Sequence, residues 1–316
     1  MRVCSVPLKV RFRGVTERQG VLLEGPAGWG EFSPFLEYDD AECVPWLRAA
    51  LEMARQPFPA PLRSAVPVNT TIPAVDPERA HALAAASGCG TAKVKVAERG
   101  QALAEDCARI EAVRDALGPH AKIRIDANAG WDLDTALRIL PELDRAASGL
   151  EYAEQPCPTV ADLAALRRRL DIPIAADESI RKSGDPEAVV RAEAADVVVL
   201  KVQPLGGVRA CLELAERLGL PVVVSSALET SVGIAAGVAL AAALPELPHA
   251  CGLATVSLSE ADPAAQSLLP VAGELPAIRV VPDGAPCLAP PDVAEWWRER
   301  VARVARLAGE DLSDVE

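Results

Sequence analysis

Short runs of β-branched and aliphatic residues alternate along most of the chain with longer stretches rich in alanine and leucine. Eight such runs end near Thr71, Lys95, Asp126, Glu154, Asp177, Lys201, Ser225 and Gly252. Successive run ends lie roughly 23 to 31 residues apart, which is enough for one strand, one helix and two loops. The pattern predicts a repeated βα unit with a parallel sheet, and eight repeats favour a (β/α)₈-type barrel over an open doubly wound sheet.

The first 60 residues have a different pattern. Two short apolar runs, Val21–Glu24 and Trp29–Phe32, flank a glycine- and proline-rich turn, and Ala41–Arg55 has helical periodicity. The proline-rich segment 57–61 indicates a boundary. A helix predicted over Val293–Leu307 falls outside the repeat, and we expect it to pack back on the N-terminal segment.

Composition narrows the class of protein. The 316 residues are 50% hydrophobic, which excludes a disordered chain, and 45 acidic against 32 basic residues give a net charge of −13. That charge argues against binding to nucleic acid or to an anionic membrane.

The apolar run Val232–Leu244 is too short to span a bilayer and predicts a buried helix. Residues 1–12 show no targeting signal, and the eight cysteines form no C-x-x-C pair. We therefore expect a cytoplasmic protein with reduced thiols.

Three carboxylates stand at the ends of consecutive predicted strands: Asp126, Glu154 and Asp177. Because the carboxyl ends of barrel strands meet at one mouth, these side chains are expected to converge and to repel one another unless a cation lies between them. Oxygen ligands without His or Cys indicate a hard divalent ion, Mg²⁺ first and Mn²⁺ second. The alternative is that each acid caps the helix that follows its strand; repetition in three successive units favours the metal site.

Lysine is rare in this chain, and three of the six lysines lie inside apolar strand patterns. Lys93 and Lys95 share one face of their strand, and Lys201 ends a strand on the opposite side of the predicted mouth. Burying a lysine is costly unless it is paired or neutral. The three lysines could be structural partners of the acids, but their rarity elsewhere favours a catalytic role.

Opposed lysines around a metal site indicate a type of chemistry. A metal ion that binds a substrate carboxylate makes its α-carbon more acidic, because the ion stabilises the enediolate formed on deprotonation. A lysine can accept that proton if its pKa falls from about 10.4 toward neutrality through burial and neighbouring positive charge. Lys93 and the metal would supply that charge to Lys95. The sequence therefore predicts proton abstraction α to a carboxylate.

The order of these motifs resembles the enolase superfamily, whose members use a Lys or His base with Mg²⁺. Within it, Lys-x-Lys on the second strand and Lys on the sixth resemble the muconate-lactonizing subgroup. The segments that carry the resemblance span nearly the whole chain: Gly28–Pro34, Ala92–Val96, Arg124–Asn128, Glu154–Cys157, Asp177–Ser179, Leu200–Lys201 and Ser225–Ser231.

The resemblance implies an α/β fold, a modified TIM barrel of the (β/α)₇β type with an α+β capping domain. Residues 1–62, completed by the C-terminal tail 285–316, would form the capping domain, and residues 63–284 the catalytic barrel.

The resemblance also implies a reaction, the Mg²⁺-dependent syn-dehydration of 2-succinyl-6-hydroxy-2,4-cyclohexadiene-1-carboxylate to o-succinylbenzoate in menaquinone biosynthesis. Lys95 would remove the α-proton and then protonate the departing hydroxyl, and Lys201 would stabilise the enediolate from the opposite face. Asp126, Glu154 and Asp177 would hold the ion. The expected partner is a small dicarboxylate, with no nucleic acid or membrane; the oligomeric state stays open.

Further roles follow from the same resemblance. Lys93 and Asn128 would contact the substrate carboxylate or the outer shell of the metal, and the succinyl end would be held by Ser225, Ser226 and Gly252. The segment Arg13–Gln19 is expected to be a loop that closes the site or an exposed turn. Arg124 shares a face with Asp126 at a deeper level and is interpreted either as a support for the metal ligands or as structural packing.

Several alternatives remain open at this stage. Racemisation of N-acylamino acids would use the same two lysines as a two-base pair. A Schiff-base lyase would instead use Lys201 as its nucleophile. Dipeptide epimerisation is disfavoured because the Asp-x-Asp expected near Gly252 is absent. A barrel that only binds carboxylates is the non-enzyme alternative, which the presence of two lysines and three carboxylates disfavours.

Overall fold

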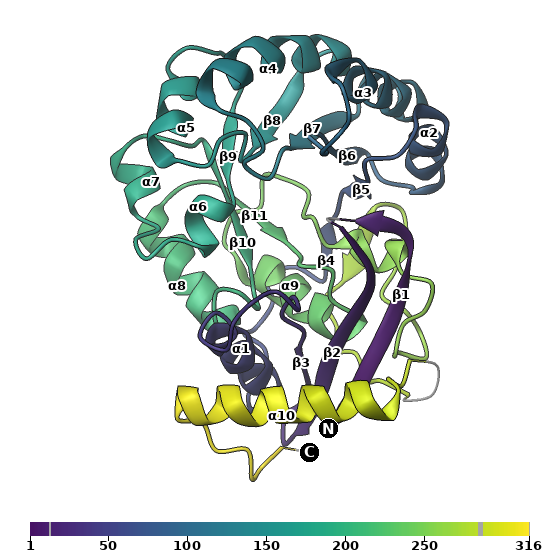
Figure 1. The fold of residues 1–316 in the computed structure, drawn as a ribbon, viewed down its shortest axis with the longest axis vertical. Helices are drawn as coiled ribbons and strands as arrows, with labels where there is room; N and C mark the ends of the chain where they lie inside the picture. The colour runs from purple at the N-terminus through teal and green to yellow at the C-terminus, as the bar shows by residue number, and fades with distance from the viewer. Residues whose placement is uncertain (13, 284–286, 316) are drawn as a thin grey trace.

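The computed structural model of the chain describes residues 1–12, 14–283 and 287–315. Figure 1 shows a barrel of strands surrounded by helices, with a smaller antiparallel sheet beside it and a long C-terminal helix across that sheet. The two parts meet along the strands of the smaller sheet, so residues from both can contribute to one site.

The barrel sheet contains seven parallel strands in sequence order, each hydrogen-bonded to the next. They are β5 (Thr70–Ile72), β6 (Thr91–Lys95), β7 (Lys122–Asp126), β8 (Leu150–Glu154), β9 (Ile174–Ala176), β10 (Val197–Lys201) and β11 (Val222–Ser225). The predicted βα repeat is present, and each strand end lies within a few residues of its predicted place.

The eighth predicted strand, residues 250–253, is shorter than expected. Only two parallel bridges represent it, Val68 with Cys251 and Ser225 with Gly252, and these join the two edges of the sheet. The chain then enters the 3₁₀ helix η1 (Ala254–Leu258), which leaves no room for a longer strand. The barrel is closed, in agreement with a modified TIM barrel of the (β/α)₇β type.

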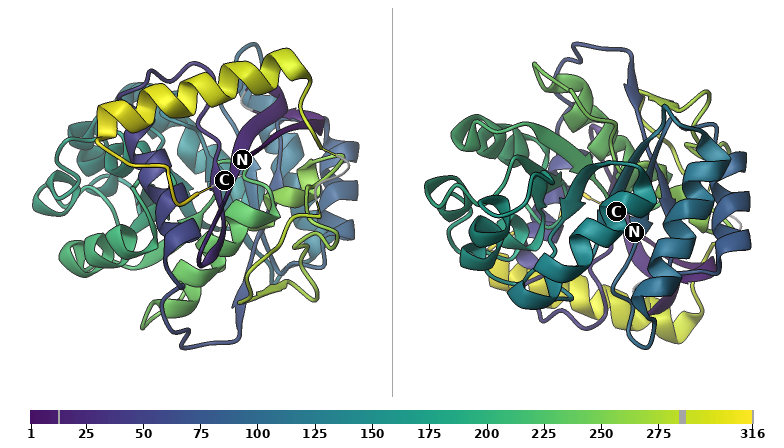
Figure 2. Two further views of the ribbon diagram at one scale, coloured as in Figure 1. Left: turned by 90° about the horizontal axis from the view of Figure 1, so that it is seen from below. Right: turned by 90° about the horizontal axis from the view of Figure 1, so that it is seen from above.

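Helices cover the outside of the barrel (Figure 2). Their bounds are α2 (Pro77–Ala86), α3 (Leu103–Leu117), α4 (Leu133–Ala147), α5 (Val160–Arg167), α6 (Glu178–Arg181), α7 (Ala188–Arg191), α8 (Val208–Leu218) and α9 (Ser231–Ala243). Side-chain oxygens of Asp76, Asp132 and Thr159 accept hydrogen bonds from the first turns of α2, α4 and α5. Helix α9 is apolar and buried along almost its whole length, as predicted.

The smaller part is an α+β capping domain. Strands β1 (Arg2–Phe12), β2 (Val15–Gly25) and β3 (Gly28–Phe32) form its antiparallel sheet, and helices α1 (Val44–Arg55) and α10 (Pro291–Ala308) pack on it. Trp297 of α10 lies edge-on against Phe32 of β3, with ring centroids 6.0 Å apart. Strands β4 (Ala65–Pro67) and β12 (Glu274–Pro276) form a separate two-stranded sheet, which belongs neither to the barrel sheet nor to the capping sheet. The domain limits 1–62, 63–284 and 285–316 stay predictions.

The predicted loop over residues 13–19 is mostly strand. Residue 13 lies outside the described residues, and β2 begins at Val15 and pairs with β1 through Glu17 opposite Pro7 and Gln19 opposite Ser5. The polar residues in this stretch resemble a loop in sequence, but antiparallel pairing allows one face of a strand to remain polar. The prediction of a loop is therefore wrong for residues 15–19.

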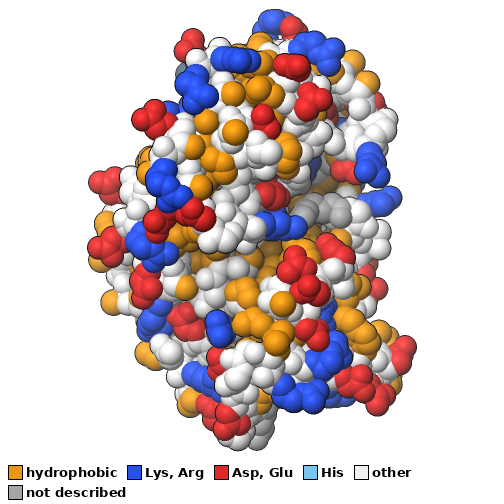
Figure 3. Space-filling model, turned by 60° about the vertical axis from the view of Figure 1, so that its left-hand side comes forward, with side chains coloured by type: hydrophobic (Ala, Val, Ile, Leu, Met, Phe, Trp, Pro, Cys, Tyr) orange, Lys and Arg blue, Asp and Glu red, His pale blue; other side chains and the backbone are white. Residues whose placement is uncertain are grey.

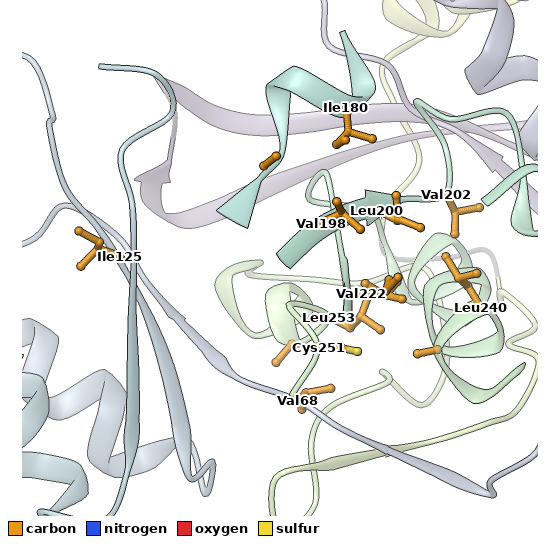
Figure 4. Close-up of a cluster of buried hydrophobic side chains, with 14 of the residues drawn as sticks. Val68, Ile125, Ile180, Val198, Leu200, Val202, Val222, Leu240, Cys251 and Leu253 are labelled. Carbon is orange, nitrogen blue, oxygen red and sulfur yellow. The ribbon is translucent and has the colours of Figure 1, made fainter. Parts of the chain in front are cut away.

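Alternation along the barrel strands separates two apolar layers. Val198 and Leu200 of β10 face outward and join a large cluster with Val222, Leu240 and Leu253 (Figure 4). The intervening positions face the barrel interior, where Tyr152, Ala175, Val197, Val199 and Val223 form a separate small cluster. Since side chains alternate with a period of two, the last interior position of each strand lies at the mouth.

The surface carries both signs of charge. Figure 3 shows basic and acidic side chains interspersed over one face, not gathered by sign. Within the described ranges of the chain, no helix combines the length and apolar character that crossing a bilayer requires.

Candidate active site

Charged side chains occupy the last interior positions of five consecutive strands at one end of the barrel. The register places Lys95 of β6 opposite Asp126 of β7, and Asp126 opposite Glu154 of β8. Asp177 directly follows β9, and Lys201 ends β10. With three strands between β6 and β10, Lys95 and Lys201 lie on opposite sides of the mouth, as the sequence predicts.

Each carboxylate at the mouth is paired with a lysine. Lys93 Nζ lies 2.9 Å from both oxygens of Glu154 and 3.4 Å from Asp126 Oδ2. Lys95 Nζ donates to Asp126 Oδ2 at 2.7 Å, and Lys201 Nζ donates to Asp177 Oδ2 at 2.6 Å. All of these side chains are buried, with Glu154 and Asp177 fully inaccessible. The site is a connected network of buried ion pairs.

Burial and charge shift the pKa values of this network in different directions. Burial lowers the pKa of Lys95, with Lys93 adding to the effect while Asp126 opposes it. Burial and the neighbouring Asp126 raise the pKa of Glu154 to about 7. The pKa of Asp177 falls below its usual range, because Lys201 and Arg181 outweigh the effect of burial. A buried lysine with a lowered pKa is suited to accept a proton.

Asn128 and two residues of α6 support the carboxylates. Asn128, which has a positive φ of 44°, donates its backbone N–H to Asp126 Oδ1 at 3.0 Å, and its side-chain oxygen accepts a hydrogen bond from Lys95. Its amide nitrogen donates to Glu178 Oε1 at 3.2 Å. Arg181 donates to Asp177 Oδ1 at 2.8 Å and to Glu178 Oε1 at 2.6 Å.

A small cavity opens onto this network. The predicted residues on its wall are Lys93, Lys95, Asp126, Asn128, Lys201, Ser225, Ser226 and Gly252. Glu154 and Asp177 lie behind that wall, paired to its lysines. The Ser226 hydroxyl donates to the Gly252 carbonyl at 2.9 Å and lies 2.8 Å from Thr255 Oγ1.

Sequence reasoning missed several residues of the site. Phe12, at the end of β1, and Phe35 reach the cavity from the capping domain, and Lys95 Nζ lies 5.5 Å from the Phe12 ring centroid. Nothing in the local sequence around either phenylalanine indicates this role. Arg181 could have been found, because it stands four residues after Asp177 and therefore on the same face of a helix.

Arg124 lies at the other end of the barrel. It donates to Glu151 Oε2 at 2.5 Å, to Asn69 Oδ1 at 3.1 Å and to the Ala250 carbonyl at 2.7 Å. The interpretation of Arg124 as a support for the metal ligands is therefore wrong, and structural packing is its role. Arg124 precedes Asp126 by two residues along β7. Its side chain points to the floor of the barrel, which is the end opposite the mouth.

The three carboxylates are not gathered as metal ligands. Among the described residues, no three His, Cys, Asp or Glu side chains stand close enough together to form a ready metal site. Each carboxylate instead directs an oxygen to a lysine. The arrangement nevertheless collects six oxygens and three lysine amines at one mouth, which suits the binding and deprotonation of a small anion.

Comparisons with known proteins agree with this architecture. Residues 76–285 match the family described as "Enolase C-terminal domain-like", and residues 3–54 match "Enolase N-terminal domain-like". The solved muconate lactonizing enzyme from Pseudomonas fluorescens, complexed with muconolactone, superimposes with a TM-score of 0.75 at 22% identity, covering 94% of this chain and 97% of that one. At this identity the likeness concerns the fold.

Two relatives are much more similar in sequence. An o-succinylbenzoate synthase of Thermobifida fusca is 64% identical over 279 residues, 88% of this chain and 87% of the relative. An o-succinylbenzoate synthase of Mycolicibacterium smegmatis is 53% identical over 305 residues, 95% of this chain and 94% of the relative. The similarity extends over both the capping domain and the barrel.

Proposed function

The chain belongs to the enolase superfamily, and we propose that it is an o-succinylbenzoate synthase, a metal-dependent hydro-lyase of menaquinone biosynthesis located in the cytoplasm. Its substrate would be the dicarboxylate 2-succinyl-6-hydroxy-2,4-cyclohexadiene-1-carboxylate, which loses water to give o-succinylbenzoate. The observation that carries the proposal is the placement of Lys95 and Lys201 on opposite sides of a three-carboxylate mouth. The two relatives described above support the choice of dehydration among the reactions this mouth could perform.

Lys95 is the proposed base. It lies on the cavity wall, and burial together with Lys93 lowers its pKa, so that its neutral amine is more accessible near neutral pH than that of an exposed lysine. It would take the proton from the carbon that bears the substrate carboxylate. Because the dehydration is syn, the hydroxyl leaves from the same face, and the Lys95 ammonium can return the proton to it as the carbon–oxygen bond breaks. The products are water and an aromatic ring.

Lys201 is proposed to face the substrate from the opposite side as a cation. Its Nζ donates to Asp177 Oδ2 at 2.6 Å, which holds the side chain at the mouth. There it can stabilise the enediolate and, as a cation over the ring that becomes aromatic, the developing π system. Lys93 would contribute positive charge close to the substrate carboxylate.

The donor set fits a hard divalent ion. Asp126, Glu154 and Asp177 supply only carboxylate oxygen, the type of ligand that Mg²⁺ takes in proteins. These three residues would hold Mg²⁺, with Mn²⁺ as a substitute and Asn128 close to the outer shell. When bound, the ion supplies charge that stabilises the enediolate.

Ser225, Ser226, Gly252 and Thr255 line the part of the cavity away from the lysine pair, and we propose that this part receives the succinyl side chain. The Ser226 hydroxyl is already bonded to Gly252 and Thr255, so it would shape this end more than bind the carboxylate directly. Ser225 lies opposite Lys201 in the register and points to the same cavity.

A direct experiment tests the proposal. The purified protein with Mg²⁺ is mixed with the cyclohexadiene substrate, and o-succinylbenzoate is followed by its absorbance. We expect product with Mg²⁺ and none after chelation. Absence of product with saturating Mg²⁺ and folded protein would refute the proposed function.

The same preparation can be assayed for racemisation of N-succinylamino acids, which requires the same lysine pair. Dehydration that is at least tenfold more efficient than racemisation is the expected outcome. Racemisation without dehydration would assign the alternative. Trapping of Lys201 by borohydride in the presence of substrate would instead indicate a Schiff base, and we expect none.

A further inference from the structure

One wall of the active-site cavity is formed by the segment that connects β11 to α9. Ser225, Ser226, Ala227 and Leu228 all line the cavity. Leu228 has a φ of +64°, in the left-handed region that residues with a side chain rarely adopt. A conformation of this kind persists only where surrounding contacts hold it, so the contacts of this wall segment, residues 225–233, are informative.

Arg18 of β2 holds the backbone on both sides of Leu228. Its Nε donates to the Leu228 carbonyl at 3.3 Å, and its Nη2 donates to the Ala227 carbonyl at 3.2 Å and also to the Ser33 carbonyl. The side chain is buried and stacks 4.3 Å from the Phe35 ring centroid. A planar guanidinium can bind three carbonyls at once, whereas a lysine ammonium lacks this fixed fork.

Glu31 of β3 holds the other end of the wall segment. Its carboxylate accepts hydrogen bonds from the Thr230 N–H at 3.2 Å, the Thr230 hydroxyl at 2.5 Å and the Gly233 N–H at 2.9 Å. These donors form the first turn of α9, which has no acidic residue of its own there. The capping domain thus supplies the anion that the amino terminus of a barrel helix favours.

The contact is closely packed and reaches back to the catalytic strands. A Cβ on Gly233 would lie 2.8 Å from Glu31 Oε2 and 2.7 Å from Glu229 Cβ, so only glycine fits. Ser33 donates its hydroxyl to Glu31 at 2.7 Å and its N–H to Gln203 at 3.0 Å. Gln203 stands two residues after Lys201, and its side chain donates back to the Ser33 hydroxyl at 3.0 Å.

We propose that Arg18 and Glu31 are positioning residues: from the capping domain they fix the backbone of the wall segment, and thereby the shape of the substrate end of the cavity. Neither residue lines that cavity. The inference rests on the proposed function, because the wall they hold would contact the side chain of the substrate, not the carbon that loses its proton. Their loss should therefore weaken substrate binding more than it slows the chemical step.

The test compares Arg18→Met, Arg18→Lys and Glu31→Gln with the wild type. We expect KM for the cyclohexadiene substrate to rise about tenfold, with kcat changed by less than about threefold. Amide hydrogen exchange over residues 227–233 should become faster, while the stabilisation by Mg²⁺ is retained. Burial, with Glu229, raises the pKa of Glu31 to about 7, so the assays are run near pH 8, where its carboxylate is charged.

Arg63 provides a matched control. It holds carbonyls at the opposite end of the same helix, donating to Ala241 at 2.6 Å and to Leu244 at 2.8 Å. Arg63→Met should lower stability without raising KM and without faster exchange at 227–233. Equal changes of KM and exchange in Arg18→Met and Arg63→Met would overturn the proposal, because they would indicate a general loss of stability.

A second pair of variants tests the role of the left-handed residue. Leu228→Gly and Leu228→Ala both remove the side chain, but only glycine adopts a φ of +64° without a Cβ penalty. In the Arg18→Met background we expect the glycine variant to have a KM several-fold lower than the alanine variant. Equal KM values would contradict the proposal. If the wild type failed to dehydrate the substrate, the proposed function would fall, whereas hydrogen exchange would still report on the wall segment.

Discussion

The barrel contains two polar clusters, one at each end of its strands, and a different buried side chain stands at the centre of each. At the mouth, Lys95 and Lys201 pair with carboxylates beside a cavity. At the floor, Arg124 pairs with Glu151, which also accepts from His249 Nδ1 at 3.0 Å. Arg124 at the floor is as buried as the lysines at the mouth, so burial alone does not distinguish a catalytic cation from a structural one.

The pKa shifts of Lys95 at the mouth and Arg124 at the floor run in opposite directions. At the mouth, burial lowers the pKa of Lys95, which brings proton release within reach. At the floor, the pKa of Arg124 is raised, because Tyr152 and Glu151 outweigh the effect of burial. A guanidinium keeps its charge at any physiological pH, whereas a buried ammonium can lose it. A lysine therefore stands at the position where we propose that a proton moves, and an arginine holds the buried ion pair at the floor.

The largest expected effect is on kcat, and it should follow removal of a lysine at the mouth of the barrel but not of a lysine at the floor. Lys201→Ala should lower kcat for dehydration by about 10³-fold, because it removes charge that faces the enediolate. The matched control is Lys122→Ala, at the floor end of β7, where an exposed lysine pairs with Glu151 at 3.0 Å. Its kcat should stay within about twofold of the wild type, as expected for an exposed ion pair. Comparable losses in the two variants would remove the distinction between mouth and floor.

The second largest effect is a loss of stability that we expect when the ion pair at the floor is broken. Arg124→Met leaves Glu151, Asn69 and the Ala250 carbonyl without their common donor, and it should lower the free energy of unfolding by about 3 kcal/mol. Urea unfolding measures this loss. The folded fraction should keep its kcat and its response to Mg²⁺, and a selective loss of kcat would show that Arg124 serves the active site.

Acid titration separates the floor further. Although burial opposes it, the hydrogen bond with His249 and the charge of Arg124 lower the pKa of Glu151 to about 2. This depressed pKa means that Glu151 stabilises the fold above its unfolded pKa of about 4.5, and the stabilisation is lost as the pH falls toward 2. Glu151→Gln should cost about 2 kcal/mol at pH 7, a loss that shrinks between pH 4.5 and 3 in urea unfolding. A deficit that is constant with pH would contradict this assignment.

The smallest effect concerns the metal at the mouth. A ligand present at about ten times its Kd stabilises a protein by about 1.4 kcal/mol, so Mg²⁺ at that concentration should raise Tm by a few degrees. Asp126→Asn should abolish this increase, whereas Arg124→Met should retain it. An equal Mg²⁺ response in wild type and Asp126→Asn would place the ion elsewhere.

The mouth could be predicted from the sequence because strand alternation and a regular repeat are local properties. Lys95, Asp126 and Glu154 fall at matching positions of successive repeats, and the structure places them in one register. Alternation also put Arg124 on the interior face, but it could not tell which end of the barrel its side chain would serve.

Contacts between segments far apart in the sequence could not be predicted from strand alternation or from the repeat. Phe12 reaches the cavity from β1, and Glu31 bonds to Gly233 of α9, 202 residues further along the chain; no spacing rule connects them. The short eighth strand and the left-handed Leu228 depend on how the barrel closes, which local propensity does not encode. The sequence thus predicted the positions of the charged residues at the mouth better than the walls around them.

The account depends most on Lys95 as a proton-transferring base, and Lys95→Arg tests this claim most directly. Arginine keeps the positive charge beside Asp126 but does not release its proton. With saturating Mg²⁺ and the cyclohexadiene substrate, we predict a folded protein with a normal Mg²⁺-dependent rise in Tm and no o-succinylbenzoate above background. Product formation by the Lys95→Arg protein at a rate near that of the wild type would contradict the account.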